Sequence, residues 1–373
     1  MTAPCGPIHS LTGVRAFAAL WVVFFHFRHN VGVVESIEFG PLVRRGYLGV
    51  DVFFVLSGLV LAYTYSNRFE RDSSPRAFIE YLSLRLGRIY PLHAVVLLAY
   101  ALLFLAGKAG GFTPLDPRIT GIWDGAMSVL MLHAWGFTDR LAWNEASWSI
   151  SAEWFAYLFV LLPVLRIFRR WGPVPLVALA AMSWIVLCYF ALNTARRSLD
   201  FTYEFGAFRC AVEFFAGYAV YRFAEARPLG PRTGDALAAM ALVALVMSVR
   251  IPGVEIWLLP CVSAFYLGLM ARGPLSEAIL GNRPVVFLGE ISYAIYMVHL
   301  LVRIVSNAIM KKVDFEPSTG LAVTLLSVQI AAAIGLAAAA YYLVEKPARE
   351  WVRRALARSR GASGTPAAGN EAP

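Results

Sequence analysis

Charged residues are scarce in this chain of 373 residues, since Asp, Glu, Lys and Arg together make up 15% of the sequence. A typical soluble domain carries roughly 25%. Hydrophobic residues make up 59%, and the mean hydropathy is +0.62. This composition excludes a water-soluble globular protein, because so few charged side chains cannot cover the surface of a soluble fold of this size.

Cysteine is also rare, and the four cysteines form no Cys-x-x-Cys pair. Cys188, Cys210 and Cys261 lie inside apolar runs, where a thiol behaves as a small hydrophobic group. The pattern predicts neither a disulfide framework nor a zinc site, and we expect no metal.

The sequence is instead rich in apolar runs of about 15 to 25 residues, each near the length that crosses roughly 30 Å of hydrocarbon as a helix. They predict an all-α, polytopic transmembrane helical bundle of about ten spans, surrounded by membrane lipids. We expect an integral-membrane domain over residues 1–354 and a disordered cytoplasmic tail over 355–373, where Ser, Gly, Ala and Pro dominate. The expected spans are Leu11–Phe27, Leu48–Tyr65, Ile89–Ala106, Trp148–Leu165, Val174–Leu192, Phe205–Phe223, Ala236–Val249, Glu255–Met270, Val285–Ile309 and Leu321–Val344.

The basic residues predict the orientation of these spans. The chain holds 33 Lys and Arg against 24 Asp and Glu, a formal net charge of +9. With both termini in the cytoplasm, 19 of the 33 lie in cytoplasmic segments, in agreement with the positive-inside rule. The excess charge is thereby explained as a topology signal, and we expect no nucleic-acid partner. The apolar segment from Ile122 to Trp135 is short for a span and is predicted to be interfacial or re-entrant.

Four ionisable residues are expected at one depth, toward the outer face: His26, Asp51, Glu153 and His299. Such residues are costly in lipid, so each is a functional candidate. A carboxylate beside a histidine fixes its tautomer and stabilises the imidazolium, which is the arrangement of a general base. We therefore predict that His26 is catalytic and is oriented by Asp51 or Glu153. The alternative is that His26 only packs between helices.

Three arginines, Arg15, Arg85 and Arg88, are expected near the cytoplasmic face. Guanidinium groups bind phosphate oxygens through paired hydrogen bonds, so the three predict a polyphosphate site. Arg15 and His26 are eleven residues apart, about 16 Å along a helix. One elongated molecule could therefore be held at one face while its other end reaches His26. Alternatively, Arg85 and Arg88 are only topology charges that flank the third span.

Two other classes of protein fit the same residues. A proton-coupled transporter or flippase also places His, Asp and Glu in the membrane, as a proton relay. A non-catalytic membrane scaffold would tolerate the loss of His26 and Glu153.

Six sequence blocks together resemble the integral-membrane acyltransferase-3 family, in order and at similar separations. The resemblance extends from Leu11 to about Arg354. The blocks are LTGVRAFAALWVVFFHF (11–27), YLGVDVFFVLSGLVLAY (47–63), RLGRIYPLH (85–93), WSISAEWFAYLFVLLP (148–163), FLGEISYAIYMVHL (287–300) and YYLVEKPAR (341–349).

The resemblance implies a multi-pass enzyme of a bacterial-type inner (cytoplasmic) membrane. Such an enzyme moves an acyl group, usually acetyl, from acyl-CoA to a hydroxyl of a carbohydrate or lipid-linked glycan, as in lipopolysaccharide or exopolysaccharide. A macrolide-type small molecule is the alternative acceptor. Acyl-CoA is thus the expected co-substrate, and either direct transfer or an acyl-enzyme intermediate is compatible with it.

The resemblance also assigns residues. Arg15 and His26 match the first-helix motif, and Arg85 with Arg88 matches the Arg-x-x-Arg motif that implies donor binding. The remaining matches are a serine within the second helix and the serines and acidic residue that open the fourth, and with His299 these serines are expected to bind substrate. These matched residues are Ser57, Ser149, Ser151 and Glu153.

Overall fold

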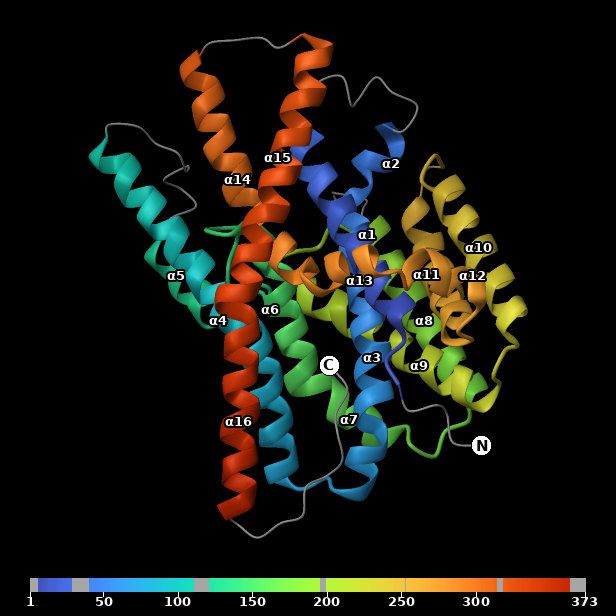
Figure 1. Ribbon diagram of the computed structural model, residues 1–373. Coiled ribbons are helices and arrows are strands. Elements are labelled where there is room, and N and C mark those ends of the chain that lie inside the picture. The colour runs from blue at the N-terminus through green and yellow to red at the C-terminus, as the bar shows by residue number, and fades with distance from the viewer. Residues whose placement is uncertain are drawn as a thin grey trace.

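The computed structural model describes residues 6–28, 40–110, 121–194, 199–251, 253–313 and 318–362. Within these ranges every regular element is helical, which confirms the all-α class (Figure 1). Two 3-10 turns, η3 (Gly46–Leu48) and η5 (Glu145–Ser147), directly precede α-helices, and two π-helical turns, η6 (Ala156–Val160) and η7 (Tyr341–Glu345), each join two α-helices. The α-helices are α1 (His9–Phe27), α2 (Gly40–Arg44), α3 (Gly49–Arg71), α4 (Pro75–Ala109), α5 (Ile122–Val129), α6 (Trp148–Phe155), α7 (Leu161–Ile167), α8 (Pro173–Leu192), α9 (Gly206–Ala226), α10 (Pro231–Ser248), α11 (Val254–Met270), α12 (Pro274–Leu280), α13 (Arg283–Glu290), α14 (Ser292–Val313), α15 (Thr319–Ala340) and α16 (Lys346–Ala362).

All ten predicted spans fall on helices, but the count of ten is not confirmed. By length and composition, seven described helices can cross a membrane, or eight if the bent pair of Glu255–Met270 and Pro274–Leu280 is one span. The predicted spans that fall short lie on α9, α10 and α11. Helix α9 carries buried charges in its interior, α10 opens with a polar turn, and α11 has only 17 residues.

The predicted span Val285–Ile309 is not one helix. It divides at Ile291 into α13 and α14, and α13 lies across the middle of the bundle against α1 (Figure 1). The two backbones meet at Gly289, where an added Cβ would lie 2.0 Å from the Thr12 carbonyl oxygen. Glu290 is therefore the last residue of the short helix α13.

Two other boundaries bear on the predictions. The segment from Ile122 to Trp135 forms the eight-residue helix α5 followed by turns. This helix is too short to cross a bilayer, in agreement with the prediction that the segment is not a span. At the other end of the chain, α16 continues to Ala362, so the first eight residues of the predicted tail (355–362) are helical. The rest of that tail, 363–373, lies outside the described residues.

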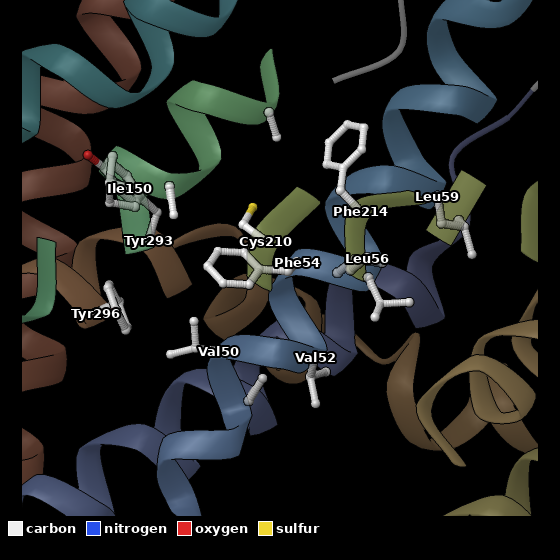
Figure 2. Packing of buried hydrophobic residues seen from close by; sticks show 14 of the residues in the cluster. Val50, Val52, Phe54, Leu56, Leu59, Ile150, Cys210, Phe214, Tyr293 and Tyr296 are labelled. Carbon is white, nitrogen blue, oxygen red and sulfur yellow. The ribbon is translucent and has the colours of Figure 1, made fainter. Parts of the chain in front are cut away.

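The core is built on α3 and α9, which pack without intervening side chains. A Cβ on Gly58 would lie 1.9 Å from the Phe214 carbonyl oxygen, and one on Gly217 would lie 2.0 Å from that of Val55. Membrane helices use small residues in this way because lipid supplies little hydrophobic drive for association. Around this contact, side chains from α3, α6, α9 and α14 interdigitate (Figure 2).

Several of the segments that were predicted to be cytoplasmic lie together at one end of the bundle. Arg166, at the end of α7, donates to the Ser73 carbonyl between α3 and α4 at 2.6 Å. Arg222 on α9 donates to the carbonyls of Phe168 and Trp171 after α7. The basic helix α16 runs beside the first half of α4 (Figure 1). This grouping matches the charge pattern from which the orientation was predicted.

Replacing Gly217 with Ala should lower the free energy of unfolding by about 1–3 kcal/mol, because the new methyl group would force α3 and α9 apart. Denaturant unfolding of the purified protein in detergent measures the loss. The control is Gly335→Ala on α15, where nothing lies within 4 Å of the added Cβ. That variant should be neutral or slightly stabilising. Equal unfolding midpoints would contradict the close contact of the two helices.

Candidate active site

Two histidines from opposite parts of the sequence meet in the bundle. His26 lies in the last turn of α1 and His299 in the first half of α14. The Nε2 atom of His299 is 3.2 Å from Nδ1 of His26, and the ring centroids are 4.8 Å apart. His299 is fully buried, whereas His26 is partly exposed. His26 therefore faces a neighbouring helix, and the expected proximity of His299 holds.

Two backbone carbonyls define how the protons are arranged on this pair. Nδ1 of His299 is 2.6 Å from the Tyr296 carbonyl oxygen, so it carries a hydrogen that it donates. Its Nε2 is then an acceptor. Nδ1 of His26 lies 2.9 Å from the Val22 carbonyl oxygen and must also be a donor, shared with His299 Nε2. The basic lone pair of neutral His26 is therefore on Nε2.

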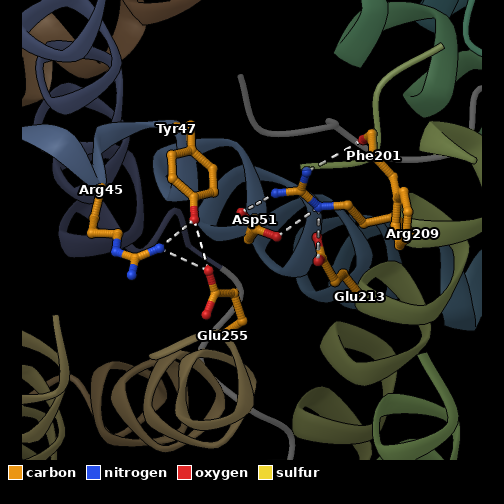
Figure 3. A network of polar contacts seen from close by, with 7 residues as sticks. All are labelled: Arg45, Tyr47, Asp51, Phe201, Arg209, Glu213 and Glu255. Carbon is orange, nitrogen blue, oxygen red and sulfur yellow. Dashed lines mark hydrogen bonds and ion pairs between the residues drawn. The ribbon is translucent and has the colours of Figure 1, made fainter. Parts of the chain in front are cut away.

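Asp51 does not orient His26 as predicted. Its carboxylate forms a two-pronged ion pair with Arg209 on α9, with Oδ1 2.9 Å from Nε (Figure 3). Both side chains are almost completely buried. Glu213 lies beside the same guanidinium at 3.6 Å, and the Arg209 Cζ lies 5.5 Å from the centre of the Trp148 ring. Asp51 thus ties α3 to α9, since Arg209 donates to both of its oxygens.

Glu153 also has partners other than the predicted one. Its carboxylate accepts a hydrogen bond from the Ser57 hydroxyl and interacts electrostatically with Tyr157. It interacts electrostatically with Arg15, which places it toward the arginine end of α1 rather than at the depth of His26. Ser57 therefore positions Glu153, and nothing in this geometry assigns it to a substrate.

The two serines that open the fourth predicted span hold backbone turns. Ser151 is fully buried, donates to the Met131 carbonyl at 2.7 Å and accepts from the Ala134 amide at 3.0 Å. Its hydroxyl is thus saturated by the turn after α5. Ser149 donates to the Tyr296 hydroxyl at 2.8 Å, one turn before His299. Ser149 can act on the histidine pair only through that tyrosine.

Sequence reasoning gave no role to two charged residues beside the histidines. Arg303, one turn after His299, donates to the His26 carbonyl at 3.4 Å. It lies 3.7 Å from Glu145, which precedes α6. Both are partly exposed, with side-chain accessibilities of 25% and 38%. The sequence could have indicated Arg303, because it lies four residues after His299 and so on the same face of a helix. It gave no comparable indication for Glu145, which lies in the connection before α6.

At the other end of α1, two of the three predicted arginines come together. Arg15 and Arg88 share an electrostatic environment with Glu345, the last residue of η7, and with Arg349 near the start of α16. Arg85 points elsewhere, since its Nη2 donates to the Tyr65 hydroxyl at 3.1 Å and its guanidinium lies over that ring. The predicted group of Arg15, Arg85 and Arg88 is therefore replaced by one that contains Arg349.

A second buried histidine pair does not supply a base. His93 and His133 have parallel rings 6.3 Å apart, and each Nε2 contacts a serine oxygen. Burial, followed by the neighbouring His93, lowers the pKa of His133 to about 4. His133 thus stays neutral at physiological pH and packs the loop before α6.

Replacing Arg209 with Met should lower the free energy of unfolding by about 3–5 kcal/mol, because it leaves a buried Asp51 carboxylate without its counter-charge. The double variant Asp51→Leu with Arg209→Met should recover most of that loss. Unfolding of the single and double variants in mixed detergent provides the measurement. Additive losses would contradict the pairing and restore Asp51 as a candidate partner of His26.

Comparison with known proteins now defines the family. Residues 8–343 match the family model described as "Acyltransferase domain". The chain is 32% identical over 166 residues to "Protein 2 in picA locus" of Rhizobium radiobacter, covering 43% of this chain and 81% of that protein. It is 32% identical over 157 residues to acyltransferase MdmB of Streptomyces mycarofaciens, covering 40% of this chain but only 37% of that protein.

No solved structure matches this chain. The family match covers most of the sequence, confirms the resemblance carried by the six blocks, and agrees with the apolar helices of the bundle. The chain therefore belongs to the acyltransferase-3 family and is a multi-pass membrane acyltransferase.

Proposed function

We propose that this protein is an acyl-CoA-dependent O-acyltransferase of the bacterial-type cytoplasmic membrane. It transfers an acetyl group from acetyl-CoA to a hydroxyl of a carbohydrate or lipid-linked glycan. The observation that carries the proposal is the His26–His299 contact, because it fixes the tautomer of a partly exposed histidine so that Nε2 is its basic nitrogen. A metal has no role in this proposal.

The arginine group at the far end of α1 suits the donor. The eleven residues between Arg15 and His26 correspond to about 16 Å of helix, and a pantetheine arm is of similar length, roughly 15–20 Å. Phosphates bound at Arg15 and Arg88 would thus place the thioester near His26. Along α1, the arginine group lies on the side of His26 that faces the end of the bundle where the basic segments gather (Figure 1), and we assign that end to the cytoplasm.

The histidine pair accounts for the transfer step. Nε2 of His26 takes the proton of the acceptor hydroxyl while the hydroxyl oxygen bonds to the thioester carbonyl carbon. The tetrahedral intermediate then collapses, the C–S bond breaks with its electron pair on sulfur, and the thiolate takes the proton from His26. During these steps the imidazolium is stabilised by the Val22 carbonyl, by His299 Nε2 and by the negative end of the α1 dipole.

His26→Gln should lower kcat by about 10²-fold to 10⁴-fold, because it removes the general base. The Kd for coenzyme A should stay within about threefold of wild type, because the arginine group is about 16 Å away. His299→Leu should lower kcat by about tenfold or more, since His26 loses the acceptor that orients it. Transfer from [14C]acetyl-CoA by protein in nanodiscs, with coenzyme A binding by calorimetry, gives both values.

The matched control is His133→Gln, which replaces a buried histidine outside the proposed machinery and should keep kcat if the protein folds. Wild-type transfer by His26→Gln would end the catalytic role of His26. Transport of a solute by wild-type vesicles without consumption of acetyl-CoA would instead favour a transporter. Mass spectrometry of surface glycans with and without the gene identifies the acceptor, and unchanged glycans would redirect the search to small molecules.

Arg88→Gln should raise the KM for acetyl-CoA by about tenfold and leave kcat nearly unchanged, because a phosphate contact is equally strong in the ground and transition states. Arg76→Gln is the control, since Arg76 is an exposed arginine on the same helix. Initial rates over a range of acetyl-CoA concentrations separate the two constants. An unchanged KM for Arg88→Gln would reduce Arg88 to a topology signal.

A further inference from the structure

Glu213 and Glu345 are two buried carboxylates of the described residues whose oxygens accept no hydrogen bond, and Glu345 is the one that interacts with several arginines. Glu345 is 1% exposed, and neither of its oxygens accepts a hydrogen bond from the described residues. Its nearest charged contact is Arg349 Nη1 at 3.5 Å. A buried carboxylate costs free energy unless opposite charges surround it, so the arginines around Glu345 must supply that compensation.

The backbone places Glu345 in this position through an unusual turn. Glu345 ends the π-helical turn η7 between α15 and α16. Along α15 and η7 every fourth residue is buried, whereas an α-helix repeats every 3.6 residues. These buried residues are Ala333, Ala337, Tyr341 and Glu345. The wider turn keeps Glu345 on the inner face. Such π-turns are frequent at functional sites.

The guanidinium groups around Glu345 have unused hydrogen-bonding capacity. Arg15 from α1, Arg88 from α4 and Arg349 from α16 all interact with its charge. Among the described residues, neither Arg15 nor Arg88 makes a hydrogen bond or an ion pair within contact distance. Three cations around one anion leave an excess positive charge of two, together with many free N–H donors. This combination fits a multiply charged oxyanion.

We propose that Glu345 is a built-in counter-ion of the donor site: it holds Arg15, Arg88 and Arg349 together when the site is empty and gives up their charge when donor phosphates bind. Arg349 is thereby a third phosphate ligand that the Arg-x-x-Arg motif does not reveal. This inference rests on the proposed function, because it takes coenzyme A as the source of the phosphates. Glu345 is a positioning residue: its carboxylate holds the arginines in place and does not itself bind the phosphates, which it repels.

The role of Glu345 follows from like-charge repulsion. Three guanidinium groups gathered in a partly desolvated site repel one another, so without a carboxylate they would splay or lose stability. The same carboxylate weakens the binding of any phosphate, because it competes for the same N–H donors. Removing its charge should therefore destabilise the empty protein and tighten phosphate binding. A carboxylate that only packs two helices would give the first effect without the second.

The test measures binding of coenzyme A to the purified full-length protein in nanodiscs by calorimetry, with inorganic pyrophosphate as a competitor. Glu345→Gln should lower the unfolding midpoint of the unliganded protein and also lower the Kd for coenzyme A by about threefold or more. Arg349→Gln should raise that Kd by about tenfold. The control Arg358→Gln removes an exposed arginine further along α16 and should stay within about twofold.

Each outcome bears on a different claim. If Glu345→Gln binds coenzyme A as wild type does, or more weakly, the counter-ion role is overturned. If Arg349→Gln behaves like Arg358→Gln, Arg349 is not a phosphate ligand. If wild type binds neither coenzyme A nor pyrophosphate, the proposed donor itself is wrong. If Glu345→Gln does not fold, Glu345→Asp is the second variant. Its carboxylate lies one methylene group further from the arginines, so it should also lower the Kd for coenzyme A.

Discussion

The constraint on which this bundle depends is that a charge inside a membrane protein needs its compensation inside the protein. Lipid offers neither hydrogen bonds nor counter-ions, so every buried ionisable side chain fixes the neighbour that stabilises it. Asp51 and Arg209 show the structural use of this rule, since their ion pair joins α3 to α9 beside the glycine contact of the same helices. Glu345 and its arginines show the other use, in which compensation is incomplete and a ligand can supply the rest.

The histidine pair solves a related problem with neutral groups. A carboxylate beside His26 would have added one more charge to be compensated within the bundle. His299 and the Val22 carbonyl instead fix the tautomer of His26 through neutral acceptors. Because His299 is fully buried, its own tautomer is fixed in turn by the Tyr296 carbonyl, and Ser149 and Phe53 hold the ring of that tyrosine. The base is thus positioned by backbone geometry, which costs no buried charge.

Hydropathy and charge predicted which segments are helical and which residues lie deep, and the reasons for the failures are equally specific. Depth follows from counting residues along a helix, and it correctly separated Arg15 from His26. Direction around the helix axis does not follow from depth, because residues at one level of different helices can face different neighbours. Asp51 and Glu153 were therefore assigned to His26, although one faces α9 and the other accepts from Ser57.

Averaged hydropathy also cannot detect a single-residue break such as Ile291, or a π-turn such as η7. Both bear on the site, since the break sets α13 across α1 and the π-turn keeps Glu345 on the inner face, where it interacts electrostatically with Arg15. A six-block resemblance supplied the family but not these local departures from regular helix, so Arg349 could be read only as a basic residue near the membrane surface.

The balance of charge in each buried cluster distinguishes structural from functional groups in this protein. Around Arg209 the single guanidinium is matched by Asp51, with Glu213 also at 3.6 Å, so no positive charge is left over for an additional anion. Around Glu345 the bases outnumber the acid, and an anion would be attracted. The two clusters use the same residue types, and both lie deep in the bundle. Only the second has donors left to offer, and it stands about one donor arm's length along α1 from the lone pair of His26.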